Sequence, residues 1–158
     1  MLKLLRIDDR LVHGQVAFTW VPSLGIDCLL VANDKVARDD FQKMTLGLAK
    51  PASTKLIIKS VGDAVLFLND EKNKGLKILT LVNSVVDAFA LASGVSQVQS
   101  INFGGIRARE GAKLISKAIA VTEQDVTLIR ELVRRGIELE IRQVPSDQKQ
   151  KVESFIQN

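Results

Sequence analysis

Residues 2–16 read Leu2-Lys3-Leu4-Leu5-Arg6-Ile7-Asp8-Asp9-Arg10-Leu11-Val12-His13-Gly14-Gln15-Val16, and this stretch decides the fold. An apolar run over residues 2–7 predicts a strand, a charged turn follows it, and a helical pattern begins at His13. A strand that leads through a short turn into a helix is typical of α/β proteins, which place reactive groups at such junctions. The stretch therefore predicts an α/β fold and, at the same junction, a functional site.

The rest of the chain repeats this alternation of strand and helix. Apolar, β-rich runs predict further strands at residues 26–32, 55–59, 76–82, 99–103 and 137–142. Helical spacing predicts helices at residues 13–24, 38–48, 61–68, 84–93 and 122–135, and a terminal helix at 147–156. Strands that are apolar on both faces and alternate with helices pair in parallel. We therefore expect a doubly wound open sheet, mostly parallel, with helices on both faces.

Polar residues support several of these boundaries. Asp34 and Ser84 precede the second and fourth predicted helices, and Thr122 followed by Asp125 has the spacing of a capping box. In the strand predicted at 137–142, charged side chains alternate with apolar ones and so share one face. This strand is expected near an edge of the sheet, with its charged face in water.

Composition limits the classes of function that the chain can have. Its 158 residues, 46% hydrophobic and 25% charged, fit a single domain that spans residues 1–158. The one cysteine, Cys28, lies in an apolar run, which excludes an intrachain disulfide and favours a reducing compartment. No signal peptide and no apolar stretch of membrane-spanning length is evident, so a cytoplasmic location is expected.

Charge and residue types disfavour two further classes. The net charge of +4 favours acidic partners, but only 4% of residues are aromatic and no basic block is interleaved with them. Nucleic-acid binding is therefore disfavoured. One histidine and one cysteine far apart in sequence predict no metal site, and no motif predicts a cofactor.

The junction after the first strand carries the residues for phosphoryl transfer. His13 is the only histidine of the chain, and a neutral imidazole can attack a phosphoryl group to become a phosphohistidine. The planar guanidinium of Arg10 suits phosphate oxygens better than an ammonium group does. Backbone amides around Gly14 and Gln15, at the start of the helix, are expected to cradle the anion.

An aspartate is expected to position one of these groups. Asp8 or Asp9 could orient the guanidinium of Arg10 or accept the imidazole N–H and so select the attacking nitrogen. We assign this role to Asp9; the residues alone leave the attacking nitrogen open. A histidine near a helix start also serves as a simple cap, and the same crevice suits a non-catalytic nucleotide or anion-binding module. The combination of carboxylates, arginine, histidine and glycine at one junction favours phosphoryl transfer.

Residues 6–16 closely resemble the active-site signature of the IIB subunits of the mannose/fructose/sorbose family of the bacterial phosphoenolpyruvate-dependent sugar phosphotransferase system. The likeness continues through residues 26–34, 98–105 and 135–142 and so extends over essentially the whole chain. In that family the histidine at the position of His13 accepts phosphate from the phosphohistidine of a IIA domain. It passes the phosphate to a sugar that the membrane subunits IIC and IID translocate.

The resemblance carries further implications for site, fold and partners. It implies that Nδ1 of His13 carries the phosphate and that Arg10 assists its transfer to the sugar, whereas Arg6 is assigned to the strand. It implies an open sheet of about seven strands with one antiparallel member, and we place the seventh strand at residues 116–120. It also implies a separate IIA protein or domain, attachment to the membrane permease, and a sugar chosen by the membrane subunits. The oligomeric state is left open, a homodimer included.

A second motif, Asn102-Phe103-Gly104-Gly105-Ile106-Arg107-Ala108-Arg109, follows the strand at 99–103. Neighbouring parallel strands end at the same edge of a sheet, so Arg107 and Arg109 could form a basic rim that steers an acidic IIA partner. A flexible turn at Gly104 and Gly105 explains the glycines equally well. Trp20 is expected in the core; exposed, it would be a docking anchor.

Overall fold

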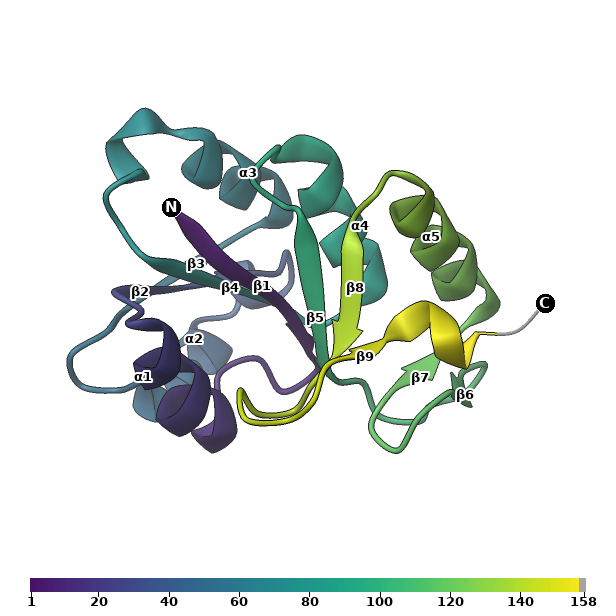
Figure 1. Cartoon of the computed structure of the whole chain (residues 1–158). Helices are drawn as coiled ribbons and strands as arrows, with labels where there is room; N and C mark the ends of the chain where they lie inside the picture. Colours follow the sequence, from purple (N-terminus) through teal and green to yellow (C-terminus); the bar gives the residue numbers. More distant parts are fainter. Residues whose placement is uncertain (157–158) are drawn as a thin grey trace.

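The computed structural model describes residues 1–156 and shows a twisted sheet with helices on both faces (Figure 1). The strands are β1 (Leu2–Asp8), β2 (Cys28–Ala32), β3 (Lys55–Lys59), β4 (Ile78–Val82), β5 (Ser100–Gly105), β6 (Lys113–Leu114), β7 (Ala120–Val121), β8 (Glu138–Ile141) and β9 (Gln150–Lys151). The α-helices are α1 (Val21–Leu24), α2 (Asp40–Ala49), α3 (Val61–Asn69), α4 (Val85–Gly94) and α5 (Glu123–Arg134). A π-helix, η1 (Val16–Trp20), precedes α1, and the 3₁₀ helices are η2 (Val36–Arg38), η3 (Glu71–Asn73) and η4 (Val152–Phe155).

The main sheet has seven strands in the order β3-β2-β4-β1-β5-β8-β9. All neighbouring pairs are parallel except β8 and β9, which are antiparallel. The expected α/β class, the mostly parallel pairing and the single antiparallel member are therefore confirmed. β1 lies in the middle of the sheet between β4 and β5, so the loop after it opens where the strand order reverses, the usual place for a ligand in such sheets.

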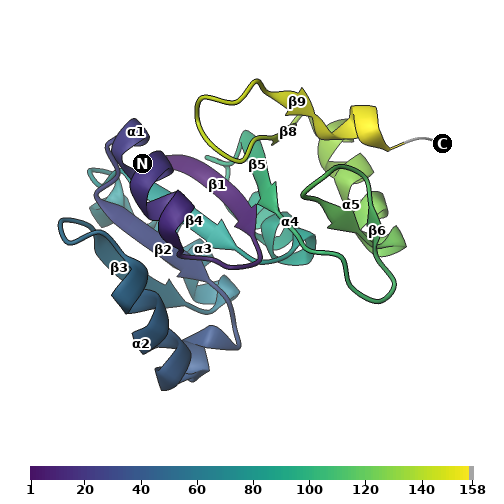
Figure 2. The ribbon, with the colours of Figure 1, turned by 90° about the horizontal axis from the view of Figure 1, so that it is seen from below.

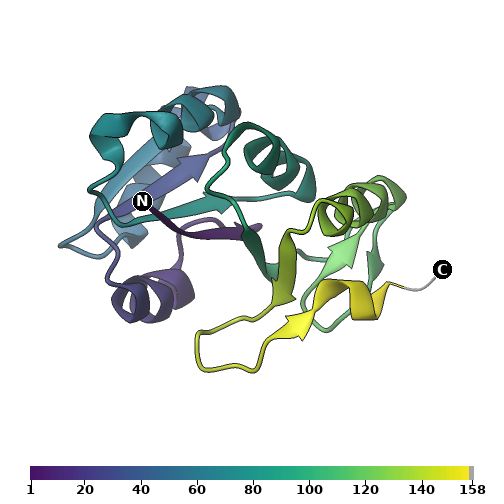
Figure 3. The same cartoon turned by 45° about the horizontal axis from the view of Figure 1, so that its top comes forward.

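The two faces of the sheet carry separate cores. On one face α3, α4 and α5 cover buried residues such as Leu5 and Ile7 of β1. On the other face η1, α1 and α2 pack over Leu4, Leu29 and other residues of the same strands. Figure 3 shows the purple η1–α1 segment below the sheet and the green α4 and α5 above it. Because side chains alternate along a strand, Arg6 and Asp8 lie on the same face as Leu4.

Two predictions about the end of the chain are wrong. The seventh strand is β9 and not residues 116–120, of which only Ala120 enters a strand, in a separate two-stranded sheet of β6 and β7. The terminal helix predicted at 147–156 is absent from that segment, which forms a loop, β9 and η4. Within this polar segment the backbone of Gln150 and Lys151 pairs with β8, and Val152 is buried in the core.

Two further expectations need correction. Glu140 is buried and not in water, because it bonds to Asn102 and Arg142 inside the molecule. Asp34 does not cap α2; its carboxylate accepts from the N–H of Val61 at the start of α3. Asp39 caps α2 instead. The caps predicted for α4, at Ser84, and for α5, at Thr122 with Asp125, are confirmed.

Candidate functional site

A tightly held loop carries His13. The chain leaves β1 at Asp8 and enters a helical segment over residues 14–24. Leu11 has a φ of +57°, a left-handed conformation that is uncommon for a branched side chain, yet its side chain and that of Val12 are buried in the core. His13 is the last residue before the helix, and its carbonyl accepts from the N–H of Ala17 at 2.9 Å. The loop is therefore fixed on both sides of the imidazole.

The imidazole is bound by Asp8. Nε2 of His13 lies 2.7 Å from Oδ2 of Asp8, a residue that is fully buried. Burial alone would raise the pKa of Asp8, but the hydrogen bond with His13, the charge of Arg6 and the N–H of Arg10 together hold it below its usual value. Asp8 is therefore an ionised acceptor. Since a carboxylate only accepts, Nε2 is the protonated nitrogen and the lone pair of the neutral ring is on Nδ1.

Arg10 lies beside the same carboxylate. Its backbone N–H donates to Oδ1 of Asp8 at 3.1 Å, and its Nε is 3.8 Å from that oxygen. The Arg10 side chain remains 54% exposed, so its guanidinium can meet an anion that approaches His13 from solvent. Asp8 thus brings the predicted Arg10 and His13 together.

Arg6 is the buried partner of Asp8. Its Nη2 and Nε lie 3.1 and 3.3 Å from Oδ2 of Asp8, and its Nη1 donates to Oδ1 of Asn102 at 2.7 Å. Nη2 also donates to the side-chain carbonyl of Gln15 at 3.3 Å. Burial lowers the pKa of Arg6, which Asp8 opposes. A cation fully enclosed in this way is stable only because its donors are satisfied.

Gly104 makes the room that Arg6 needs. Along the pairing of β1 with β5 the register shifts between Ile7 and Asp8, because Gly104 is one extra residue in β5. A Cβ at Gly104 would lie 2.1 Å from Cζ of Arg6. This role differs from both roles considered for Gly104 and Gly105 from the sequence, which were donors at the rim of the site and a flexible turn. Gly104 is a strand residue that admits a guanidinium.

Trp20 closes the buried side of the site. The guanidinium carbons of Arg6 and Arg142 lie 5.4 and 5.1 Å from the centroid of its ring, and its Nε1 donates to the carbonyl of Gln143 at 2.8 Å. Trp20 is buried, as predicted, and is not a docking anchor. Arg142 in turn bonds to Glu140, so a polar network runs from His13 through the sheet.

The carboxylate of Asp9, predicted to position His13 or Arg10, bonds to Arg107 in the structure. Its Oδ2 accepts from the N–H of Arg107 at 2.8 Å and from Nε of Arg107 at 2.9 Å. Asp9 therefore fixes the loop after β5 to the loop after β1. Arg109 donates instead to Asp125, at 3.2 Å, in the cap of α5.

Gly14 and Gln15 form the first turn after His13. A Cβ at Gly14 would meet only Phe18, at 3.9 Å, so nothing within the chain requires a glycine there. The side-chain carbonyl of Gln15 accepts a hydrogen bond from Arg6, so this side chain faces the buried part of the site. The first N–H groups of a helix lack partners within it.

Three further residues belong to the site and were not predicted from the sequence: Arg6, Asn102 and Gly104. The signal for Arg6 was its spacing: Arg6 and Asp8 lie two residues apart, and a strand puts such residues on one face. Asn102 and Gly104 carry no comparable signal, because their contacts depend on the register between β1 and β5.

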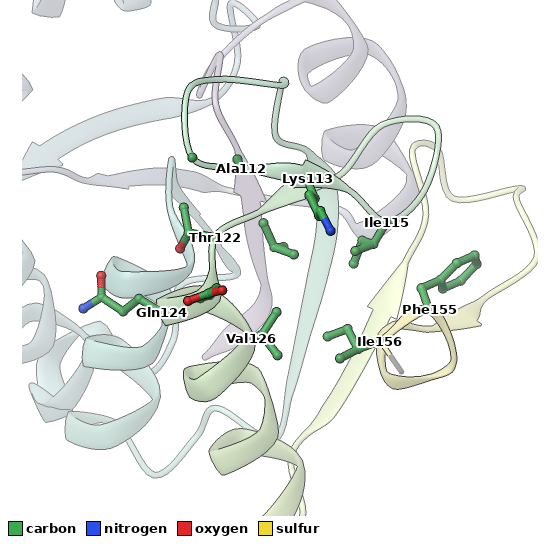
Figure 4. Close-up of a pocket in the computed structure, with 11 residues that line it drawn as sticks. Ala112, Lys113, Ile115, Thr122, Gln124, Val126, Phe155 and Ile156 are labelled. Atoms are coloured by element: carbon green, nitrogen blue, oxygen red, sulfur yellow. The ribbon is translucent and has the colours of Figure 1, made fainter. Parts of the chain in front are cut away.

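A cavity of about 730 Å³ lies elsewhere, between the β6–β7 strands, the start of α5 and η4 (Figure 4). Ile115, Val126, Phe155 and Ile156 give it an apolar lining, with Lys113 at its side. None of the predicted site residues borders it, so it is separate from the site at His13. Over residues 1–156 no cluster of metal-binding side chains occurs, and no helix has the length and apolar character needed to cross a membrane.

Comparisons with known proteins show which proteins the chain is similar to. The family model of the PTS system sorbose subfamily IIB component matches residues 2–158. The chain is 33% identical over 156 residues to the mannose-specific EIIAB component of Escherichia coli strain K12, which covers 99% of this chain and 48% of that protein. The chain thus spans about half the length of that relative. A probable phosphotransferase enzyme IIB component of Streptococcus pyogenes is 36% identical over 138 residues, covering 84% of this chain and 85% of that protein.

Solved structures are also similar. The IIBSor domain of the sorbose permease from Klebsiella pneumoniae has a TM-score of 0.93 at 29% identity and covers 98% of this chain and 95% of that one. An N-acetylgalactosamine-specific IIB component from Escherichia coli has a TM-score of 0.89 at 31% identity, over 96% of this chain and 99% of that one.

Proposed function

Because the chain belongs to the sorbose subfamily of PTS IIB components, we propose that it is a phosphoryl carrier whose acceptor is His13. In this role His13 takes the phosphoryl group from a IIA phosphohistidine and delivers it to a sugar that the membrane subunits IIC and IID import. The protein acts on the cytoplasmic side of that permease. The observation that carries the proposal is the 2.7 Å contact between Nε2 of His13 and the buried carboxylate of Asp8.

This contact supports Nδ1 as the attacking atom. With the proton on Nε2, the lone pair of Nδ1 attacks phosphorus, the Nδ1–P bond forms, and the N–P bond of the donor breaks as its electron pair returns to the donor ring. The His13 ring becomes positive during attack. Asp8 stabilises that charge through the proton it already holds in place, as a buried aspartate does for other catalytic histidines.

The same arrangement supports the second transfer. A phosphorylated imidazolium is a good leaving group. As a hydroxyl oxygen of the sugar attacks phosphorus, the new O–P bond forms, the hydroxyl proton passes to solvent, and the electron pair of the Nδ1–P bond returns to the ring. The ring proton stays on Nε2 throughout. Neither the phosphorylation of His13 nor the transfer to the sugar therefore requires the buried Asp8 to take up or release a proton. Arg10 contacts the phosphoryl oxygens with its exposed guanidinium, and the amides of Gly14 and Gln15 supply further donors.

Partner choice follows from what the site offers. In this role the chain offers its partners a phosphoryl group on His13 and exposed arginines, such as Arg10 and Arg107. Neither phosphorylation by IIA nor transfer to the sugar needs an enclosed sugar pocket at His13. As the family resemblance implies, the membrane subunits choose the sugar. The arginines attract an acidic IIA surface, and added salt will slow that encounter.

The test is phosphorylation with labelled phosphoenolpyruvate, the general phosphotransferase proteins and the IIA domain of the mannose component of Escherichia coli. Wild-type protein is expected to acquire acid-labile phosphate, and His13→Ala to acquire none. Nuclear magnetic resonance of the phosphorylated ring is expected to place phosphorus on Nδ1. Absence of uptake would favour an anion-binding module, and phosphate on Nε2 would refute the role given to Asp8.

A further inference from the structure

The outward face of α2 is apolar and uncovered. Phe41, Met44 and Leu48 are 71%, 59% and 83% exposed, and no residue of α2 is fully buried. Spacings of three and four residues place the three side chains in one stripe along the helix. We call Phe41, Met44 and Leu48 the α2 stripe. Its opposite side, with Leu46 and Ala49, packs on the sheet, so the stripe is not part of the core.

α2 lies at one end of the molecule, away from the site. β3 is the outermost strand on this side, whereas β1 and His13 lie at the middle of the sheet. Figure 2 shows α2 at the lower left, on the opposite side of the molecule from β9 and α5. A partner that covers the α2 stripe would therefore leave His13 open.

The charges on α2 select the partner and its direction. The helix begins with Asp39, whose carboxylate caps it, and the exposed Asp40; it carries Lys43 near its middle and is followed by Lys50 at its carboxyl end. A second α2 laid antiparallel places residue i opposite residue 89 − i, so that Phe41 meets Leu48 and the acidic start of one helix meets Lys50 of the other. Parallel pairing would instead oppose like charges. The helix dipoles also favour the antiparallel arrangement.

We propose that the α2 stripe is the contact surface of a homodimer, in which two copies of this chain pair their α2 helices antiparallel about a two-fold axis near Met44. A two-fold axis requires a self-complementary patch. The acidic start, the α2 stripe and Lys50 follow one another along the helix, and this order is self-complementary in the antiparallel direction. Lys43 faces a different side of the helix from the α2 stripe. The neighbouring edge of β3 is unsuited to this contact, because Lys55 and Lys59 at its ends oppose pairing with another strand.

The contact is small, so the dimer is expected to be weak. Stable interfaces bury about 800 Å² per partner, and a ten-residue helix is only about 15 Å long. Sedimentation equilibrium of the full chain over a concentration series, up to about 1 mM, measures such an association. The average mass is expected to rise from 17.4 kDa towards twice that value.

Matched variants locate the contact. Leu48→Glu puts a charge in the α2 stripe and is expected to remain at 17.4 kDa throughout, whereas Leu66→Glu makes the same change at an exposed leucine of α3, 68% exposed, and is expected to dimerise like wild type. Circular dichroism checks that both are folded. A wild-type protein that stays monomeric to about 1 mM, or a Leu48→Glu variant that dimerises like wild type, overturns the proposal.

A charge exchange tests the direction of the helices. In this register Lys50 faces Asp39, which caps the helix, with the exposed Asp40 next to it. Asp40→Lys alone and Lys50→Glu alone place like charges near one another across the contact, so each is expected to weaken dimerisation about tenfold. The double variant restores opposite charges and is expected to return to within about threefold of wild type. A double variant weaker than either single one would overturn the antiparallel arrangement.

Discussion

At the scale of single residues, Asp8 has two tasks that no other residue shares. It fixes the proton of His13 on Nε2, and it neutralises the buried Arg6. Asp8→Asn keeps the shape but loses the charge, and an amide can present its NH₂ group to the ring and reverse the tautomer. Phosphorylation of His13 is expected to slow by roughly 10²-fold or more.

The free energy of unfolding of Asp8→Asn is measured together with its phosphorylation rate. Removing one partner of a buried ion pair costs about 3 kcal/mol or more, and the bond from Arg6 to Asn102 keeps the loss near the lower end. Asp9→Asn is the matched control, because Asp9 binds only the exposed Arg107 side chain and its N–H. Its phosphorylation rate is expected to stay within about threefold of wild type. A larger defect in Asp9→Asn than in Asp8→Asn would reinstate the role first assigned to Asp9.

Arg10→Lys keeps the charge beside Asp8 but removes the planar fork. Neutral His13 can still attack, so phosphorylation by IIA is expected to persist. Transfer to sugar, measured with membranes that contain IIC and IID, is expected to fall roughly 10- to 100-fold, the equivalent of one charge-assisted hydrogen bond. Sugar phosphorylation at the wild-type rate would exclude the guanidinium of Arg10 from the mechanism.

From the sequence, Asp8 and Asp9 were both candidate partners of His13 and Arg10, and Asp9 was favoured, whereas the structure places Asp8 against both. The reason lies at the end of β1. The apolar run stops at Ile7, and the strand continues to Asp8. When a charged residue follows an apolar run, the sequence alone does not tell whether that residue belongs to the strand or to the turn. Once Asp8 is in the strand, alternation puts it with Arg6 on one face.

At the scale of elements, the bulge at Gly104, where β5 pairs with β1, leaves space for the guanidinium of Arg6. Gly104→Ala would place a methyl carbon inside that guanidinium, against atoms that are fully buried. Arg6 would have to leave Asp8, so the free energy of unfolding is expected to fall by about 3 kcal/mol or more and His13 phosphorylation to fall with it. Thermal unfolding and the phosphorylation assay measure the two effects.

Gly105→Ala is the matched control for that bulge. A Cβ at Gly105 would meet Oδ1 of Asp8 at 3.9 Å, an ordinary contact, and the residue keeps a negative φ. Its stability is expected to change by less than about 1 kcal/mol. Equal destabilisation by the two substitutions would show that the strand, and not the guanidinium, excludes a side chain.

Elements with a strong side-chain pattern were predictable, and those held by backbone pairing were not. The six parallel strands are short apolar runs, and the caps Ser84 and Thr122 begin helices as expected. β9 is Gln150–Lys151, two polar residues whose strand geometry comes from hydrogen bonds with β8. No periodicity distinguishes such a segment from a polar helix.

At the scale of the whole molecule, the buried carboxylate of Asp8 and the half-buried carboxylate of Asp87 link folding to pH in opposite directions. The pKa of Asp8 lies below its usual value, because the His13 and Arg6 interactions outweigh burial. The folded chain thus binds this proton less tightly than the unfolded chain. The pKa of Asp87 is raised, first by burial and then by the charge of Asp34, so there the folded chain binds the proton more tightly.

These signs predict the acid unfolding of two variants. The contribution of Asp8 is present above the unfolded-state pKa, about 3.9, and is lost as pH falls through the lower folded-state value. The contribution of Asp87 is present below that pKa and is lost as pH rises through its higher folded-state value. Urea titrations from about pH 6 to pH 2 are therefore expected to give a shallower loss of stability on acidification for Asp8→Asn than for wild type, and a steeper loss for Asp87→Asn. Parallel curves for Asp8→Asn and wild type would mean that the Asp8 carboxylate is not held ionised by His13 and Arg6, and the fixed tautomer of His13 would lose its support.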